Sequence, residues 1–238
     1  MLRWLGVAIA LGGAALFSRL GIWQVHRLRE RRAFNAGLEA RAALPPISLD
    51  SLLTLGLPPD SLEHRHVLAH GTFDYAHQVI AWPRSLQGSP GVYVFTPLRL
   101  ADGRNILVLR GWAFSPDAHT VDLTPLTEPD TATLHGVLLA RFGAPGGALA
   151  PGATFPIYVR TMDPAALVAL FPYPITDAVL LRQSPPVGTP DRFLDVPLEP
   201  LSAGPNLSYA IQWFSFALIA LVGGGILWVK TGDGRRKT

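Results

Sequence analysis

Cysteine is absent from the 238-residue chain, and charged side chains make up only 16% of it. The first absence excludes disulfides, thiolate metal sites and thiol nucleophiles together. The second is unusual, because soluble domains carry about 25% charged residues. Together with a positive mean hydropathy, the shortage of charge predicts that part of the chain faces lipid.

The usual catalytic signatures are also missing: there is no Gly-rich phosphate loop, no His-Glu-x-x-His and no Gly-x-Ser-x-Gly. His64, His66 and His70 could share one face of a strand and hold a metal. The alternative is a solvent-facing strand edge, which we favour. We therefore expect no metal site and no catalytic residues, and a protein that is not an enzyme.

Proline is absent from both ends, since all 22 prolines lie between Pro45 and Pro205. Residues 211–229 form 19 consecutive positions without a charge, which as a helix extend about 28 Å. Tyr209 and Trp213 precede or begin this segment and Trp228 is near its end, as in an interfacial aromatic belt. The run at 223–225 is Gly-Gly-Gly, which allows a neighbouring helix to approach closely.

A second apolar segment extends from about residue 2 to residue 22, with Arg19 placed to reach the interface. A cleaved signal peptide is the rival interpretation, with Arg3 followed by an apolar core. Cleavage after small residues such as Gly12 and Ala14 would leave that core too short. We therefore expect an uncleaved anchor.

Basic residues follow both spans, which accounts for the pI of 9.6 without nucleic acid. The basic C-terminal tail favours a cytoplasmic location, and two spans would then place the N-terminus there too. Arginines after the first span favour the opposite arrangement by the same rule. Charge alone leaves the orientation open.

The shift in composition divides the chain into five segments. These are transmembrane helix one (1–22), a juxtamembrane helix with a Pro-rich linker (23–62), an extramembrane β-rich domain (63–207), transmembrane helix two (208–230) and a basic cytoplasmic tail (231–238). Helix one should continue out of the membrane until Pro45 and Pro46 stop it.

The middle of the chain has a β texture, with short apolar runs between turn residues. Strands are expected at 67–73, 78–82, 91–100, 105–112, 133–141, 155–161 and 178–183. Asp102-Gly103 predicts a hairpin turn, and Asp163 with Pro164 predicts one short helix up to Phe171. The fold class is a membrane α+β protein whose mostly antiparallel domain is a sheet, a sandwich or an open barrel with a helix on one side.

Aromatic and polar residues border the membrane at matching ends of the two helices. They are Trp23, Gln24, His26 and Arg27 on helix one, and Tyr209, Gln212 and Trp213 on helix two. An interfacial belt with polar anchors explains most of them. The functional alternative is a site for a flat amphipathic ligand, with Arg27 available for its carboxylate or phosphate groups.

Four segments resemble the Surfeit locus protein 1 family of cytochrome c oxidase assembly factors, in the order found in that family. Residues 20–28 (Leu-Gly-Ile-Trp-Gln-Val-His-Arg-Leu) resemble its Leu-Gly-x-Trp-Gln-x-x-Arg segment, and 91–100 resemble its Gly-x-x-x-x-Thr-Pro-Leu segment. Residues 108–112 (Val-Leu-Arg-Gly-Trp) resemble its Arg-Gly-Trp strand, and 208–214 resemble its Tyr-Ala-x-Gln-Trp-Phe start of the second helix.

The resemblance implies a non-enzymatic factor that matures oxidase subunit I and takes part in haem a insertion. It implies a bacterial cytoplasmic membrane location, both termini in the cytoplasm and a periplasmic middle domain, or the intermembrane space in mitochondria. Its expected partners are the lipid bilayer, oxidase subunit I and the haem a synthesis machinery, with haem a bound only transiently. Many members carry a histidine implicated as a haem ligand where this chain has Asn206, and asparagine is no ordinary axial ligand.

Three interpretations of Asn206 stay open. Haem is held without that bond, or His26 substitutes for it, or the protein acts on the oxidase without holding haem. Two other functions also stay open: a structural or accessory subunit of a respiratory complex, and a membrane-tethered metal-dependent enzyme.

Overall fold

The computed structural model describes residues 2–140, 154–161, 167, 170–184 and 193–233. Its contacts divide the chain into two units, a helical unit (residues 1–37 and 200–238) and a domain (residues 38–199).

Two long helices, α1 (Leu2–Ala42) and α5 (Asn206–Asp233), form the helical unit and the start of the domain. Both are long and apolar enough to cross a membrane. Only 11% of the most apolar window of α1 and 17% of that of α5 is buried. A core helix of a soluble protein would be mostly buried, so their apolar surfaces are available to lipid.

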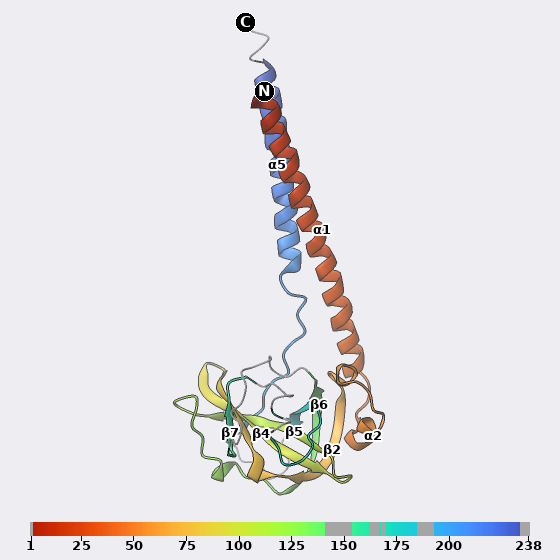
Figure 1. The fold of residues 1–238 in the computed structure, drawn as a ribbon, viewed down its shortest axis with the longest axis vertical. Coiled ribbons are helices and arrows are strands. Elements are labelled where there is room, and N and C mark those ends of the chain that lie inside the picture. Colours follow the sequence, from red (N-terminus) through yellow and green to blue (C-terminus); the bar gives the residue numbers. More distant parts are fainter. Residues whose placement is uncertain (1, 141–153, 162–166, 168–169, 185–192, 234–238) are drawn as a thin grey trace. The chain divides into compact units, whose positions relative to one another are not determined.

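The helices α1 and α5 run side by side along the apolar stretch (Figure 1). The rings of Trp4 and Trp228 meet edge to face with centroids 4.8 Å apart. Phe17 stacks on Trp213 at 5.8 Å. A Cβ at Gly224 would lie 2.7 Å from Ala10 Cβ, so the glycine permits the close approach predicted from the sequence.

The first helix continues well past its apolar stretch, as predicted. It ends at Ala42, three residues before Pro45. Proline lacks an N–H group and disfavours helical geometry in the residue before it, which explains the end.

The domain is a β-barrel. Its strands are β1 (Ile47–Ser48), β2 (His66–Phe73), β3 (Val79–Leu86), β4 (Ser89–Leu100), β5 (Asn105–Phe114), β6 (Thr131–Leu139), β7 (Ile157–Val159), β8 (Val179–Ser184) and β9 (Phe193–Leu194). They are ordered β1-β2-β6-β8-β5-β4-β3-β7, with β9 beside β5. An additional pairing of β2 with β4 closes the barrel. Most pairings are antiparallel, but β1–β2, β3–β7 and β5–β8 are parallel.

Burial follows the position of each strand in the sheet. β2 alternates between buried and exposed residues, as a strand with one solvated face does. In β5 every residue except Phe114 is buried, because elements cover both of its faces. Clusters around Phe95 and Trp112 and around Leu98 and Leu134 form the core.

The seven predicted strands are confirmed, with ends that differ by a few residues. The hairpin is also confirmed: Gly103 has a φ of 85°, and Leu100 donates to the Arg104 carbonyl at 2.8 Å. The helix predicted after Asp163 lies largely outside the described residues, as do 234–238 of the tail.

The segment before the barrel, expected as a linker, holds more structure than predicted. It contains β1, α2 (Leu49–Thr54) and α3 (Pro59–Leu62). These elements are too short to show a period in sequence. Leu49, Leu52 and Leu62 are buried in the domain core, so tertiary packing rather than local propensity stabilises them.

Candidate functional site

The seven predicted site residues are largely on the surface of the helical unit. Trp23 is 53% exposed and Tyr209 is 48% exposed, and His26, Arg27 and Gln212 are exposed as well. Trp213 is half-buried because its ring packs on Phe17 and Phe216. Aromatic rings left open beside a helix-pair core are available to an amphipathic ligand or to the lipid interface.

Among the described residues, no hydrogen bond, ion pair or ring contact joins two of these seven side chains. Arg27 donates to Glu30 at 3.1 Å, an exposed pair of small energetic value. The side-chain Oε1 of Gln24 is buried without a hydrogen-bond partner among the described residues. The structure thus leaves Gln24 with an unused acceptor and Arg27 with a weakly held cation.

Asn206, the position of the expected histidine, is the first residue of α5. Its Nδ2 donates to the Ala203 carbonyl at 2.9 Å. The amide therefore stabilises the turn that precedes the helix. His26 is the only histidine of the chain outside residues 38–199, so an imidazole ligand in the helical unit has one possible source.

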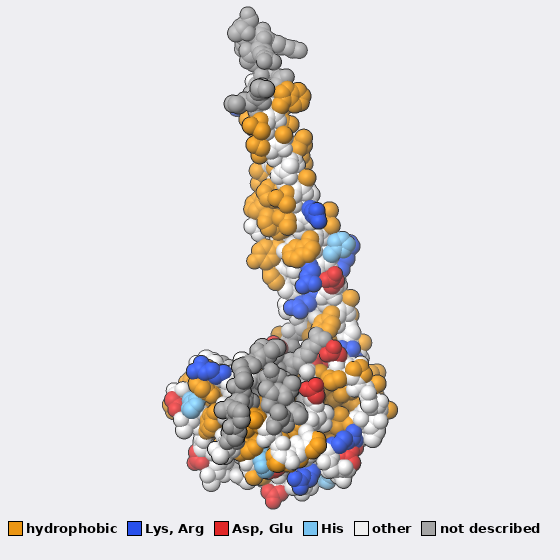
Figure 2. Space-filling model, viewed as in Figure 1, with side chains coloured by type: hydrophobic (Ala, Val, Ile, Leu, Met, Phe, Trp, Pro, Cys, Tyr) orange, Lys and Arg blue, Asp and Glu red, His pale blue; other side chains and the backbone are white. Residues whose placement is uncertain are grey.

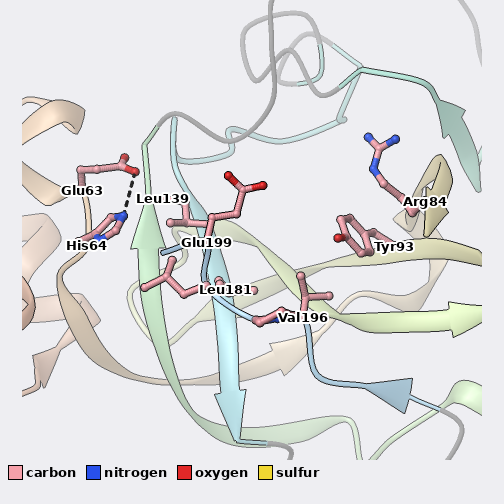
Figure 3. A pocket seen from close by; sticks show the side chains of 10 residues that line it. Glu63, His64, Arg84, Tyr93, Leu139, Leu181, Val196 and Glu199 are labelled. Atoms are coloured by element: carbon pink, nitrogen blue, oxygen red, sulfur yellow. Dashed lines mark ion pairs between the residues drawn. The ribbon is translucent and has the colours of Figure 1, made fainter. Parts of the chain in front are cut away.

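A second candidate site is a cleft of about 390 Å³ in the domain, which we call the mixed-charge cleft. Its floor is apolar, with Leu139, Leu181 and Val196. In Figure 3, Arg84 and Tyr93 lie at one side, Glu63 and His64 at the other, and Glu199 between them.

Local hydrogen bonds fix both sides of the mixed-charge cleft. Glu63 accepts from the Ala140 N–H at 2.5 Å and lies 4.0 Å from His64 Nε2. Arg84 donates to the carbonyls of Pro83 and Arg160, but makes no ion pair with a described residue.

The cleft perturbs the titration of its polar side chains. Burial lowers the pKa of Arg84, and burial followed by the charge of Glu199 raises the pKa of Tyr93. Its size and its mixture of apolar floor and polar rim suit a small amphipathic ligand or a peptide side chain. Its residues come from six separate segments of the chain, so no local sequence pattern marks the cleft.

The histidines of β2 do not gather as a metal site would require. Among the described residues, no three or more His, Asp or Glu side chains lie together so that they could hold a metal ion. His64 lies before β2, His70 contacts Thr133 at 3.0 Å, and His66 stacks on His135 at 5.5 Å. Burial and the neighbouring His135 lower the pKa of His66, which is typical of a packed imidazole pair.

A buried charge cluster lies inside the barrel. Glu128 accepts two hydrogen bonds from Arg182, at 2.7 and 2.9 Å, and its Oε1 lies 3.4 Å from Arg110. The side chains of all three are at most 1% exposed. Phe193 covers both guanidinium groups, and burial lowers the pKa of Arg110.

Two of the four segments that carry the family resemblance meet beside this cluster. Arg110 of the Arg-Gly-Trp strand contacts Thr96 of the Thr-Pro-Leu segment at 3.4 Å, and both donate to the side-chain Oε1 of Gln78. A Cβ at Gly91 would collide with the ring of Trp112. These two segments therefore build the barrel core, whereas the two helical segments present exposed side chains.

In comparisons with known proteins, a family model and several relatives align with most of the chain. The model of the SURF1 family matches residues 11–218, which include most of α1, the whole barrel and the first part of α5. A SURF1-like protein of Rickettsia felis is 26% identical over 85% of this chain and 88% of its own length. A SURF1-like protein of Monosiga brevicollis is 28% identical over 88% of this chain and 81% of its own.

A yeast relative has a more specific name. The cytochrome oxidase assembly protein SHY1 of Saccharomyces cerevisiae is 32% identical over 51% of this chain and 32% of its own length. The family model covers far more than half of the sequence. This two-helix β-barrel chain therefore belongs to the SURF1 family, the family that its four segments resemble.

Proposed function

We propose that this protein assists the assembly of cytochrome c oxidase in a membrane and is not itself an enzyme. Support comes from its membership of the SURF1 family, whose model matches residues 11–218, and from the yeast relative named for oxidase assembly. The proposal rests on a difference in exposure among the four family-like segments. The barrel segments are used in the core, so the exposed helix-end residues are the ones left for recognition.

The finer proposal is that the helix ends help haem a to reach oxidase subunit I. Trp23 and Tyr209 offer exposed rings for a flat macrocycle, and Arg27 offers a guanidinium for its carboxylates. The macrocycle, when bound, would be the group delivered, and the chain would bind, orient and release it. Within the helical unit an axial imidazole is available only from His26, the one histidine outside residues 38–199.

The proposed setting is a bacterial cytoplasmic membrane, with the domain extracytoplasmic and both termini in the cytoplasm. The length and exposure of α1 and α5 support membrane insertion. Support for the orientation comes from the resemblance alone, since basic residues flank both spans.

A deletion strain complemented with helix-end variants tests the role. Trp23→Ala with Tyr209→Ala should lower assembled oxidase and membrane haem a several-fold, by roughly the loss of two ring contacts. The matched control is Ile219→Ala with Leu218→Ala, a pair on α5 that is at least as exposed as Trp23 and Tyr209 and lies outside the proposed site. Normal oxidase spectra in the deletion strain would contradict the assembly role.

The axial ligand is tested separately, with purified full-length protein in mild detergent. His26→Ala should abolish the optical signature of bound haem a if His26 is the ligand, and Asn206→His should increase haem retention. Assembly that stays normal in His26→Ala, together with no bound haem in the wild type, would leave the assembly role intact and end the haem proposal.

A structural subunit is the second candidate, and the helix pair offers one observation in its favour. An apolar cavity of about 520 Å³ lies between α1 and α5, lined by Gly224 and Gly225. A Cβ at Gly223 or Gly225 would meet nothing within 4 Å, so another helix has room to pack there. Stoichiometric retention in the active oxidase would favour this function over a transient factor.

A further inference from the structure

The two units of the chain carry opposite net charge. Residues 38–199 contain ten arginines, no lysine and fifteen carboxylates, so the domain is acidic. The helical unit contains ten basic residues and only two acidic ones. The basic pI is therefore a property of the helices, and an attraction to anions belongs to them and not to the domain.

Four arginines, which we call the arginine collar, follow the apolar stretch of α1: Arg27, Arg29, Arg31 and Arg32. At 1.5 Å per residue they lie about 6 to 13 Å beyond Trp23, the last aromatic residue of that stretch. A bilayer has a headgroup layer of about 5 to 8 Å on each side of its hydrocarbon core. The collar therefore falls at the level of the phosphates and just outside it.

The collar is exposed and nearly without protein partners. All four side chains are exposed, and Arg27 has the one carboxylate partner, Glu30. Arg29, Arg31 and Arg32 make no hydrogen bond or ion pair with a described residue. On the face drawn in Figure 2, basic side chains (blue) lie on the helical unit past the stretch where apolar side chains (orange) predominate.

The distribution of the collar around α1 favours a surrounding surface over a single docked partner. Successive residues of a helix turn by 100°, so Arg29 and Arg31 project to different sides of α1. A protein partner would cover one side, whereas a headgroup layer surrounds the helix. The exclusive use of arginine also suits phosphate, which the planar guanidinium binds through two hydrogen bonds.

We propose that the arginine collar binds the phosphates of anionic phospholipids around α1. Anionic lipids are thereby enriched in the shell of lipid that surrounds the protein. Membrane insertion is the premise, and the oxidase is not needed. Each arginine near an anionic surface strengthens binding by about fivefold. Three of them together should favour anionic over zwitterionic lipid by at least about tenfold, after allowance for incomplete contact.

The test uses the full-length protein in discs of phosphatidylcholine mixed with phosphatidylglycerol. Lipids retained on release from the disc are identified by native mass spectrometry. The variant is Arg29→Gln with Arg31→Gln and Arg32→Gln, which leaves Arg27 in place. A second variant has lysine at the same three positions, and a third has Arg99→Gln with Arg160→Gln on the domain surface as a charge control.

We expect phosphatidylglycerol to be enriched on the wild type, the lysine variant and the domain control, and the enrichment to fall at least about tenfold in the glutamine variant. Equal enrichment in the glutamine variant and the wild type would overturn the proposal. So would loss in the domain control, which would indicate binding to the domain. Displacement of the lipid by millimolar inorganic phosphate would indicate a free-phosphate site and would likewise overturn it.

Discussion

At the scale of single residues, Glu128 neutralises one of two arginines that the barrel encloses. Arg110 and Arg182 are both at most 1% exposed, and the Nε atoms of both have no hydrogen-bond partner among the described residues. A buried guanidinium is tolerated only when a carboxylate and aromatic faces replace its hydration. Glu128 is therefore the residue whose loss the core tolerates least.

Glu128→Gln should destabilise the protein by about 3–5 kcal/mol, because it leaves two buried cations without a counter-charge. The free energy of unfolding, measured by denaturant titration in mild detergent, provides the check. Glu199→Gln serves as the control, since Glu199 is exposed and makes no ion pair with a described residue. Equal stability of the two variants would contradict this account of the cluster.

A second prediction at this scale concerns pH. Burial would raise the pKa of Asp74, but hydrogen bonds from Tyr173 at 2.6 Å and from His77 at 2.8 Å outweigh it and lower the pKa. A carboxylate whose pKa is lowered by folding stabilises the fold fully at pH values above its unfolded pKa of about 3.9. That stabilisation is lost as the pH falls from this value through the lower pKa of the folded state. Stability should therefore decline on acidification below about pH 4.

Tyr173→Phe isolates the contribution of Asp74 from those of Asp102 and Asp117, whose pKa values are lowered as well, chiefly by side-chain hydrogen bonds. The variant should be less stable than the wild type at neutral pH, and the difference should shrink at acid pH. Unfolding curves at a series of pH values measure it. Tyr209→Phe, which removes an exposed phenol, should show no such trend, and a parallel shift of both variants would contradict the assignment.

At the scale of elements, the pairing of α1 with α5 depends on where its glycines face. Gly224 is buried against Ala10, whereas Gly223 beside it has open space. The run of three glycines in the sequence does not show which of them faces α1. The helix pair supplies the answer: successive residues point 100° apart around the axis, and of the three glycines only Gly224 points at α1.

Gly224→Leu should therefore separate the helices and cost about 1–3 kcal/mol by overpacking, whereas Gly223→Leu should be nearly neutral. The chain has no cysteine, so Gly6→Cys with Leu227→Cys provides a disulfide reporter. These positions face each other, since a Cβ at Gly6 would lie 3.8 Å from Leu227 Cδ1. Cross-linking should drop only in the Gly224 variant, and an equal drop in both would show that the pairing is wrong.

At the scale of the whole molecule, the chain combines an acidic barrel with a basic pair of helices. The barrel has a closed set of strands and its own core clusters within residues 38–199. A closed barrel leaves few unpaired strand edges and does not need lipid to satisfy its backbone. Folding of the barrel should therefore be separable from insertion of the helices.

Residues 38–199 expressed alone should form a soluble, cooperatively unfolding protein that migrates as an anion at about pH 7, opposite to the full chain. Circular dichroism with thermal unfolding and native electrophoresis measure both properties. Glu128→Gln in the same fragment should lose the cooperative transition. A fragment that aggregates even at low concentration would indicate that the helices complete the barrel core.

The sequence by itself determined the features that depend on local composition and period. Two apolar segments, the continuation of α1 to the prolines, seven strands and one hairpin follow from hydropathy, alternation and turn chemistry. The exposed helix-end residues were identified in the same way, and their role in binding stays a prediction. Local patterns suffice for these elements because hydropathy, alternation and turn residues are properties of each segment by itself.

Only the tertiary structure decided which distant residues meet. Closure of the barrel through β2 and β4, the burial of Arg110 with Glu128, and the mixed-charge cleft all join segments far apart in the chain. A single sequence does not record such pairings, because strand order and side-chain packing depend on contacts that form only when the whole domain folds. For the same reason Arg110, which in sequence stands in a family-like segment, proved to be a core residue rather than part of an exposed site.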